Sequence, residues 1–244
     1  MLKLYHFWSS TCSKKVRIAL AEKGLDWESR HIDLGPKQEN TEPWYVKLNP
    51  NGVVPTLDHD GRIIIESNVI IEYLDDVFPD IHLRPGDAYG RAQMRIWLDR
   101  TEHVVHRNVN MISFNRRFLP RLAEKSDAEK EAVINRMPNL EKRREMLRRL
   151  RAGVSVDDEA QAEAALAGVM DMMEVQLGQT PWLAGEEFSL ADICITPFIE
   201  RFGANGLTAL IDWRSRPAVG DWWRRIQSRP SYDEGMNFPN PAAA

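Results

Sequence analysis

The chain is poor in cysteine and in long apolar runs for its 244 residues. Its two cysteines, Cys12 and Cys194, cannot form a disulfide framework, so we expect a reducing, cytoplasmic location. No apolar run approaches the ~18 residues that indicate a membrane-spanning helix, so we expect no membrane association. The first residues alternate like a strand and lack the pattern of a secretory signal. A formal net charge of -4 gives no general attraction to nucleic acid, and none is expected as a partner.

What remains is ordinary globular composition, 43% hydrophobic and 28% charged, in a chain long enough for one or two domains. Residues 1–79 alternate short strand and helix patterns. Asp60-Gly61 suits a type I′ hairpin turn, and Ser67 can cap the helix that follows the hairpin. The order βαβ followed by αββα predicts a small α/β domain. Strands are expected from about Leu4 and at 27–34, 53–57 and 62–66, with helices from about 16, 41 and 67.

Strand patterns end at a polar, proline-bearing connector that runs from Pro79 to Asp87. Beyond it, apolar residues recur at helical spacing, so residues 88–244 are expected to form an all-α domain. Its charged segment at about 118–153 is predicted to be a helical insert that is broken near Pro138. Helices are expected at 89–118, 126–153, 157–178, 189–205 and 218–229.

The stretch from Leu4 to Leu25 contains a predicted strand, a hydroxyl-rich turn and a helix with Gly24 at its C-cap. Such a turn places hydroxyls and free backbone N–H groups at a helix N-terminus. That end carries about half a positive charge and therefore favours bound anions. A thiolate is one anion that would suit it.

Two dipeptides in the first domain have both a structural and a functional interpretation. Val54-Pro55 is either an ordinary edge-strand proline or a cis bend that turns the Val54 backbone outward to pair with an extended peptide. Glu66-Ser67 is either a surface acid before a helix cap or a clamp. As a clamp, Ser67 would hold a carboxylate and Glu66 an ammonium, which together fit an amino-acid head group.

In the second domain, Ser189-Leu190-Ala191-Asp192 is a capping-box pattern in which Asp replaces the usual Glu. It precedes an apolar helix, so we expect it to fix a buried helix and to contribute about 1 kcal/mol through Ser189. Cys194 lies in that apolar helix and is interpreted as a small core residue.

Together these motifs resemble the glutathione transferases that have a thioredoxin-like N-terminal domain and a helical C-terminal domain, over nearly the whole chain. The segment 49–57 resembles the family's cis-proline loop, 66–74 its γ-glutamyl clamp and third helix, and 188–193 its C-domain capping motif. The resemblance implies an α/β thioredoxin-like domain followed by an all-α domain, a cis Val54–Pro55 bond and a homodimer. It also implies glutathione as co-substrate, held by Thr41, Val54, Pro55, Glu66 and Ser67.

Within the family, segments of this chain resemble two different subgroups. Ser10-Thr11-Cys12-Ser13 resembles the zeta-class Ser-Ser-Cys loop and departs from it at Thr11. Segments 66–79, 83–85 and 91–97, with the helical insert, look more like the bacterial β-etherases that cleave lignin-type aryl ethers. That likeness implies that the glutathione thiolate attacks an activated carbon and displaces an aryl oxide. The alternatives are a zeta-like isomerase, general conjugation, or a non-catalytic module that only binds glutathione or a partner.

The free energy needed to ionise the glutathione thiol at neutral pH can be estimated. A free thiol has a pKa near 8.5, and lowering it by about two units requires roughly 2.7 kcal/mol. A helix terminus supplies about 0.3–1 kcal/mol, or ~2 when partly buried, and a hydroxyl that donates to a charged sulfur adds about 1.5–3. Neither the helix terminus nor the hydroxyl comfortably supplies this free energy alone, but the two together do. A serine hydroxyl that points at the sulfur is therefore required. Ser13 aligns with the β-etherase serine and Ser10 with the zeta serine; we favour Ser13, ahead of Ser9 and Thr11.

Cys12 is the rival nucleophile, because a helix N-terminus beside Lys14 and Lys15 would lower its pKa. It would make the protein a glutathione-dependent thiol reductase, although no C-x-x-C motif is present. His103 and His106 lack a third ligand, so no metal is expected. The basic run at 142–151 is interleaved with acids and has an apolar side, as in a solvated amphipathic helix. The second substrate is expected to be an apolar aromatic molecule in a pocket formed by Trp8, His106, Asn110 and Phe114.

Overall fold

The structure is a computed structural model that describes residues 1–240. Its N-terminal part contains a mixed sheet with the strand order β2-β1-β3-β4. β2 pairs parallel with β1, whereas β3 runs antiparallel to both β1 and β4. The strands are β1 (Leu2–His6), β2 (Trp27–His31), β3 (Thr56–His59) and β4 (Arg62–Ile65).

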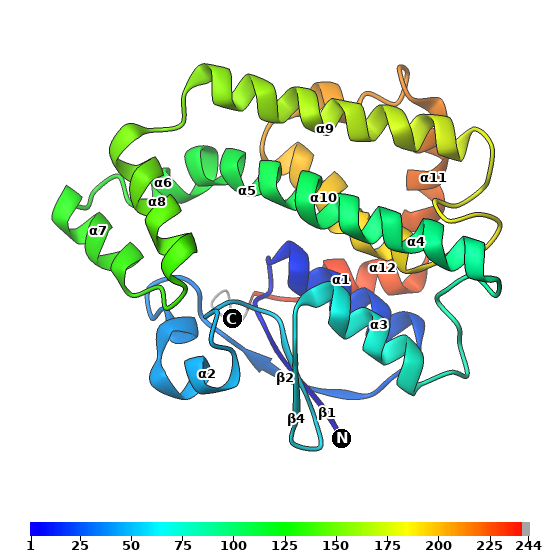
Figure 1. Cartoon of the computed structure of the whole chain (residues 1–244), viewed down its shortest axis with the longest axis horizontal. Coiled ribbons are helices and arrows are strands. Elements are labelled where there is room, and N and C mark those ends of the chain that lie inside the picture. The colour runs from blue at the N-terminus through cyan, green and yellow to red at the C-terminus, as the bar shows by residue number, and fades with distance from the viewer. Residues whose placement is uncertain (241–244) are drawn as a thin grey trace.

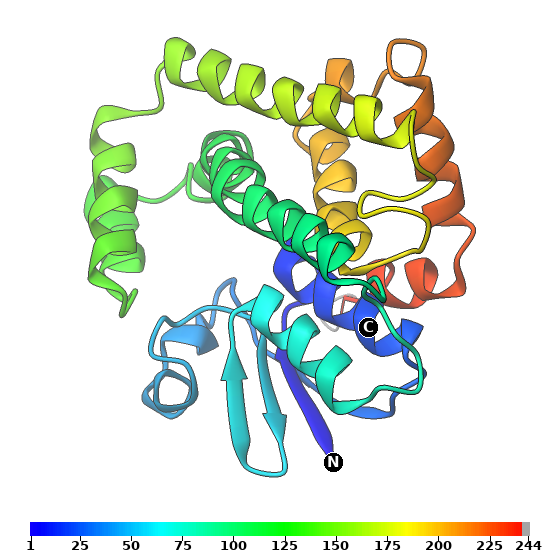
Figure 2. The ribbon, with the colours of Figure 1, turned by 45° about the vertical axis from the view of Figure 1, so that its right-hand side comes forward.

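Three helices accompany this sheet. α1 (Thr11–Glu22) and α3 (Ser67–Val77) lie between the sheet and the helical part of the chain (Figures 1 and 2). α2 (Pro43–Leu48), preceded by the 3-10 turn η1 (Glu39–Thr41), lies beside the sheet. Buried leucines from β1 and β3 pack with apolar residues of α1 and α3 in one core. The predicted thioredoxin-like fold is confirmed.

The remaining chain is helical, as predicted, and no helix within residues 1–240 is long and apolar enough to cross a bilayer. Residues 88–121 form one continuous rod with π-helical turns. The rod comprises α4 (Ala88–Arg100), η2 (Thr101–His106), α5 (Arg107–Ser113), η3 (Phe114–Phe118) and α6 (Leu119–Arg121). A helical hairpin follows, formed by α7 (Asp127–Asn135) and α8 (Leu140–Ala152), and then come α9 (Val156–Leu177), α10 (Leu190–Ala204), η4 (Thr208–Ile211), α11 (Pro217–Gln227) and α12 (Pro230–Met236).

Several local predictions are confirmed. The Val54–Pro55 bond is cis, Gly24 has a φ of 59°, and both Asp60 and Gly61 have the positive φ of a type I′ turn. The predicted helix at 126–153 is interrupted between α7 and α8, close to Pro138. The strand expected at 53–57 was wrong at its start: β3 begins at Thr56, because Pro55 has no N–H to donate to the ladder with β1. α12 was not predicted, since its seven residues show no apolar periodicity.

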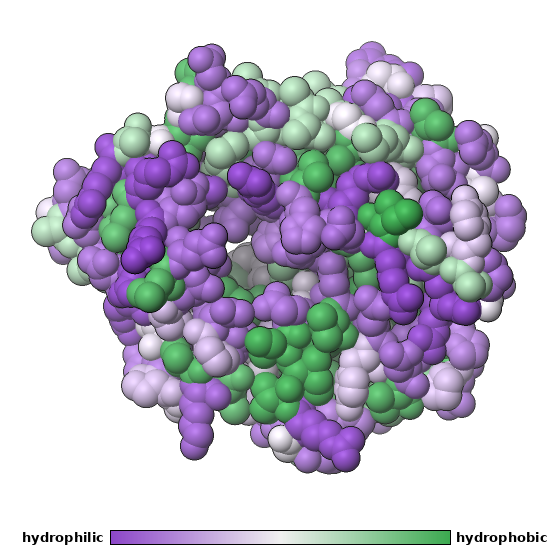
Figure 3. Space-filling view, viewed as in Figure 1, coloured by the Kyte–Doolittle hydropathy of each residue, from purple (hydrophilic) through white to green (hydrophobic). Residues whose placement is uncertain are grey.

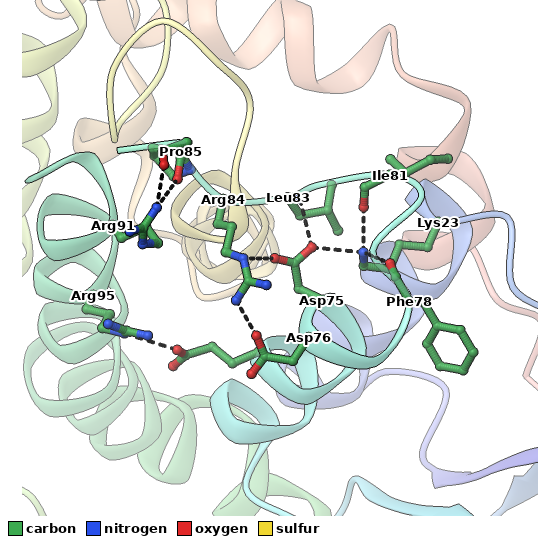
Figure 4. Close-up of polar contacts among 12 residues, drawn as sticks. Lys23, Asp75, Asp76, Phe78, Ile81, Leu83, Arg84, Pro85, Arg91 and Arg95 are labelled. Carbon is green, nitrogen blue, oxygen red and sulfur yellow. Dashed lines mark hydrogen bonds and ion pairs between the residues drawn. The ribbon is translucent and has the colours of Figure 1, made fainter. Parts of the chain in front are cut away.

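The connector between the two parts is held by a buried polar cluster around Asp75 at the end of α3 (Figure 4). The carboxylate of Asp75 pairs with Lys23 at 2.8 Å and accepts from the Leu83 N–H at 2.8 Å. Lys23 also donates to the carbonyls of Phe78 and Ile81, at 2.8 and 2.5 Å. These bonds fix the direction in which the chain leaves the first domain, and so the position of the helical part over α1 and α3.

α10 is the buried central helix of the second part, and the predicted capping box at its start is confirmed. Ser189 accepts from the Ala191 N–H, while the Asp192 carboxylate accepts from the Ser189 N–H at 3.0 Å. Asp192 also accepts from the Trp222 indole N–H at 2.8 Å and from the Leu183 N–H at 3.1 Å. The cap therefore joins α10 to α11 and to the loop before it. Cys194 is fully buried, as expected.

Candidate functional site

A cavity of about 530 Å³ opens where the sheet-containing part meets the helical part. Its floor consists of the loop before α1, the segment before β3 and the start of α3. Its walls come from the long rod, from α10 and from the α7–α8 hairpin. Figure 3 shows the surface hollowed between the hairpin and the body of the molecule, with mostly hydrophilic residues around the opening.

The start of α3 presents polar groups to this cavity. Ser67 is the first residue of α3 and is buried, and Glu66 before it has a φ of 68°, a strained conformation for a residue other than glycine. The Glu66 side chain does not cap the helix; it accepts from the Asn51 amide at 3.2 Å and remains exposed. The helix N-terminus and one carboxylate therefore lie side by side, an arrangement that can bind a zwitterion.

The cis Val54–Pro55 segment lines the cavity beside Ser67. Val54 is 7% exposed, and β3 takes up the ladder with β1 only after Pro55. Thr41 also lines the cavity, where its hydroxyl donates to the Gln38 carbonyl at 2.8 Å. All the residues that the sequence assigned to glutathione thus line one surface.

The α7–α8 hairpin closes over this side of the cavity. Polar contacts join it to the first domain: Arg136 pairs with Glu42 at 2.8 Å, and the Asn139 amide donates to Asn51 at 3.2 Å. Gly52 has a φ of 59°, and a Cβ there would lie 2.5 Å from Pro138, so only glycine permits this approach. The insert is therefore a wall of the site rather than a remote appendage.

The two candidate serines lie in different surroundings. Ser10 is the N-cap of α1: its Oγ accepts from the Ser13 N–H at 3.3 Å, and the residue lines the cavity. As an acceptor in the cap, the Ser10 hydroxyl keeps its own hydrogen free to donate. Ser13 is fully buried, does not line the cavity, and its Oγ accepts from the Phe7 N–H at 3.3 Å. The preference for Ser13 therefore disagrees with this geometry, because the Ser13 hydroxyl faces the inside of the loop.

Cys12 lines the cavity at the start of a chain of charged groups. Its Sγ lies 3.9 Å from Nε2 of His106, whose Nδ1 is 2.8 Å from the Glu102 carboxylate. Glu102 is in turn 3.6 Å from the ammonium of the fully buried Lys15. The sulfur, imidazole and carboxylate have the order of a thiol–base–orienting-acid triad.

These contacts alter the ionisation of all three groups. Burial opposes ionisation of Cys12, but the positive charges of His106 and Lys15 outweigh it and lower the pKa of the thiol to about 6. The negative charge of Cys12, with help from Glu102, overcomes burial and raises the pKa of His106 to about 10. The hydrogen bond from His106 lowers the pKa of Glu102 to about 2. Both shifts favour the charged forms, a Cys12 thiolate beside a His106 imidazolium.

Of the four residues predicted to form the substrate pocket, three lie on the helical side of the cavity. His106, Asn110 and Phe114 line it, and His106 and Phe114 belong to the π-helical turns η2 and η3. π-Helical turns occur frequently at functional sites. Trp8 does not line the cavity; its ring lies against Phe7, with centroids 5.9 Å apart. The assignment of Trp8 to the substrate pocket therefore disagrees with the cavity lining, to which its neighbour Phe7 contributes instead.

Several cavity residues were missed by sequence reasoning. They are Glu102, Arg117, Arg121 and Lys142, which come from the rod and the hairpin, and Arg201, which comes from α10. The spacing of Glu102 and His106, four residues apart on a helix, could have identified that pair. No local sequence pattern identifies the three arginines as cavity residues. Within residues 1–240, no group of three or more His, Cys, Asp or Glu side chains is arranged to hold a metal ion.

The comparisons with known proteins agree with each other. The family model described as the glutathione S-transferase N-terminal domain matches residues 9–77, and that of the C-terminal domain matches residues 131–225. Protein LigF of Sphingobium sp. strain SYK-6 is 33% identical over 96% of this chain and 92% of its own length. The crystal structure of β-etherase LigF superposes with a TM-score of 0.88, at 32% identity, over 97% of this chain and 98% of that one. The tetrachloro-p-hydroquinone reductive dehalogenase of Sphingobium chlorophenolicum is 29% identical over 98% of this chain and 97% of its own.

Proposed function

Since this chain belongs to the glutathione S-transferase family, an enzyme family that uses glutathione as co-substrate, we propose that it cleaves aryl ethers as a β-etherase. The glutathione thiolate attacks the activated carbon that carries the ether oxygen. A carbon–sulfur bond forms, the carbon–oxygen bond breaks, and the aryl oxide leaves with the electron pair and takes up a proton. The likeness to β-etherase LigF over nearly the whole of both chains is the observation that carries this assignment.

In this proposal the tripeptide lies along the floor of the cavity. Its α-ammonium pairs with the Glu66 carboxylate, and its α-carboxylate binds the N-terminus of α3 and the Ser67 hydroxyl. The backbone of Val54, before the cis Pro55, pairs with the extended peptide, and Thr41 contacts its other end. This pose directs the sulfur toward the loop at the start of α1.

The sulfur is then activated by Ser10 rather than by Ser13. The Ser10 hydroxyl lines the cavity at the N-terminus of α1, so it can donate to the sulfur while its oxygen still caps the helix. Hydroxyl and helix terminus together supply the roughly 2.7 kcal/mol that a thiolate at neutral pH requires. The aromatic second substrate lies on the helical side, beside Asn110 and Phe114.

Three substrates separate this function from its alternatives: a model β-aryl ether ketone, chlorodinitrobenzene and a maleyl-type acid. The proposal expects release of the phenol from the first, in the presence of glutathione and in stoichiometric amounts with the thioether. Turnover of only the maleyl-type acid would instead indicate a zeta-like isomerase. Glutathione binding without turnover of any of them would indicate a non-catalytic module.

A second candidate function is favoured by one contact, the 3.9 Å approach of Cys12 Sγ to His106 Nε2. A Cys12 thiolate would attack the glutathione sulfur of a glutathione mixed disulfide, form an enzyme–glutathione disulfide and release the other sulfur as a thiolate. A second glutathione would then reduce the enzyme and leave as oxidised glutathione. Reduction of a glutathione mixed disulfide by the wild type but not by Cys12→Ser would support this activity.

We further propose that the protein is a cytoplasmic homodimer. Apolar side chains are exposed on the face formed by α4 and α9, among them Ile96, Met172 and Val175 at 46, 50 and 64%. A cavity of about 420 Å³ lies between these helices. Light scattering should give twice the 28.1 kDa chain mass, and Val175→Asp should give the monomer. A monomeric wild type would exclude this dimer. A reducing compartment agrees with the two free cysteines.

A further inference from the structure

Three arginines gather at one end of the active-site cavity. Arg117 comes from η3, Arg121 ends α6, and Arg201 comes from α10; all three line the cavity. Arg117 and Arg121 are four residues apart on the rod, and the fold brings the distant Arg201 to them where the rod passes the C-terminal half of α10. Their positions place three permanent positive charges on the second-substrate side.

None of these three arginines forms an ion pair with a carboxylate in the part of the chain that the structure describes. The carboxylates that line the cavity are Glu66, at the α3 end, and Glu102, which pairs with His106 and Lys15. Glu200, next to Arg201 in the sequence, pairs with Lys14 instead. Arg116 shows the contrast, because it lies outside the cavity lining and pairs with both Glu159 and Glu163, at 2.8 and 2.6 Å.

The hydrogen bonds of the three guanidinium groups leave donors free. Arg201 uses one nitrogen to donate to the Ser9 carbonyl at 2.6 Å, while its Nε is buried and has no partner. Arg117 donates to the Ala204 carbonyl at 3.3 Å. Burial and the charge of Arg117 lower the pKa of Arg201, and Arg121 adds to this effect, while the charge of Glu200 partly offsets it. An anion between them would relieve this repulsion and satisfy the free donors.

Apolar groups stand beside the arginines. Phe114 and Phe118 stack with ring centroids 5.4 Å apart, and both line the cavity with Val109. The site therefore offers an aromatic wall next to a cationic end. We propose that the second substrate is an aromatic molecule that carries a carboxylate, with the ring against Phe114 and Phe118 and the carboxylate between Arg117, Arg121 and Arg201. This inference rests on the proposed function, since it names the substrate class of the same site.

Binding tests the inference independently of turnover. Phenoxyacetate and its neutral amide are titrated calorimetrically into the wild type with saturating glutathione. The carboxylate should bind at least about tenfold more tightly than the amide, because charge-assisted hydrogen bonds are the strong ones. Arg117→Gln/Arg121→Gln should abolish that difference. Arg107→Gln, an exposed arginine of the same rod outside the cavity lining, should keep it.

Equal affinity for the two probes in the wild type would overturn the inference, as would a preference that survives the double substitution. A loss of glutathione affinity in the double variant would also overturn it, because the arginines would then hold the tripeptide. Turnover is read separately, with β-aryl ether ketones whose leaving ring carries a carboxylate or its methyl ester. If neither is cleaved while phenoxyacetate is still preferred, the proposed function fails and the anion site stands.

Discussion

The Ser13 backbone N–H donates to the Ser10 hydroxyl oxygen at 3.3 Å, so the two serines are coupled although only Ser10 faces the cavity. This bond holds the Ser10 oxygen at the N-terminus of α1, and the buried Ser13 hydroxyl accepts from the Phe7 N–H on the other side of the loop. Ser10 is therefore the serine that the cavity exposes, and Ser13 helps to hold the turn that exposes it.

Ser10→Ala should lower kcat/KM for ether cleavage by roughly ten- to a hundredfold, since a hydroxyl bond to a charged sulfur contributes about 1.5–3 kcal/mol. The pKa of bound glutathione, followed by thiolate absorbance, should rise in the same variant. Ser10→Thr serves as the control because it keeps the hydroxyl and the helix cap.

Ser13→Ala should instead act on stability. It leaves the part-buried Phe7 N–H without its acceptor, which costs about 1–3 kcal/mol of unfolding free energy, while kcat/KM changes only a few-fold. Denaturant titration and the kinetic assay measure the two effects. If Ser13→Ala slowed turnover as much as Ser10→Ala does, the assignment of Ser10 would be wrong.

Alkylation of Cys12 by iodoacetamide should follow the lowered pKa of its thiol, about 6. The thiolate is the reactive form, so the rate should be near its maximum above pH 7 and fall as the pH drops through 6. His106→Gln removes the neighbouring positive charge and should move this transition toward higher pH. Cys12→Ser is the control, because Cys194 is fully buried and burial raises the pKa of its thiol. A profile unchanged by His106→Gln would contradict the pairing.

The Glu66 carboxylate should contribute to glutathione binding and little to the chemical step. Glu66→Gln keeps the shape but removes the charge, so KM for glutathione should rise about tenfold with kcat nearly unchanged. Glu72→Gln is a matched control on α3, where Glu72 pairs with Arg95 and does not line the cavity. An equal effect of both substitutions would argue for general electrostatics instead of a clamp.

Asp192→Asn should destabilise the protein by about 3 kcal/mol, because the carboxylate accepts from Leu183, Ser189 and Trp222 in a fully buried position. Asp158→Asn offers the comparison, since Asp158 has the same role in the exposed capping box of α9 and should cost less than about 1 kcal/mol. Thermal unfolding of both variants measures the difference. Similar losses of unfolding free energy in the two variants would show that burial does not strengthen the capping box.

The fold was predictable wherever a local pattern determines a local structure. The Asp60-Gly61 turn, the Gly24 cap and the box at Ser189 each depend on residues that are close in sequence. For the same reason, the sequence predicted the break between α7 and α8 and the extent of the long rod. The start of β3 was missed although its cause is also local, because Pro55 has no N–H to donate to the ladder with β1.

Of the cavity residues, those that come from the N-terminal domain were the most predictable from the sequence. Residues at strand and helix ends, such as Val54 and Glu66, have positions that follow from the fold. Whether Ser10 or Ser13 faces the cavity depends on how the loop turns, and the hydroxyl pattern alone contains no sign of it. Arg201 reaches the cavity because of where α10 crosses the rod, and the π-helical turns shift which side chains of the rod face inward. Both are consequences of packing between distant segments.

The α7–α8 hairpin that touches Asn51 and Gly52 has a consequence for the order of events in a catalytic cycle. In the proposed pose, the tripeptide on the cavity floor would lie beneath a wall held by polar contacts, whereas the second substrate would lie farther along the rod. We therefore expect glutathione to load first and its thioether product to depart last.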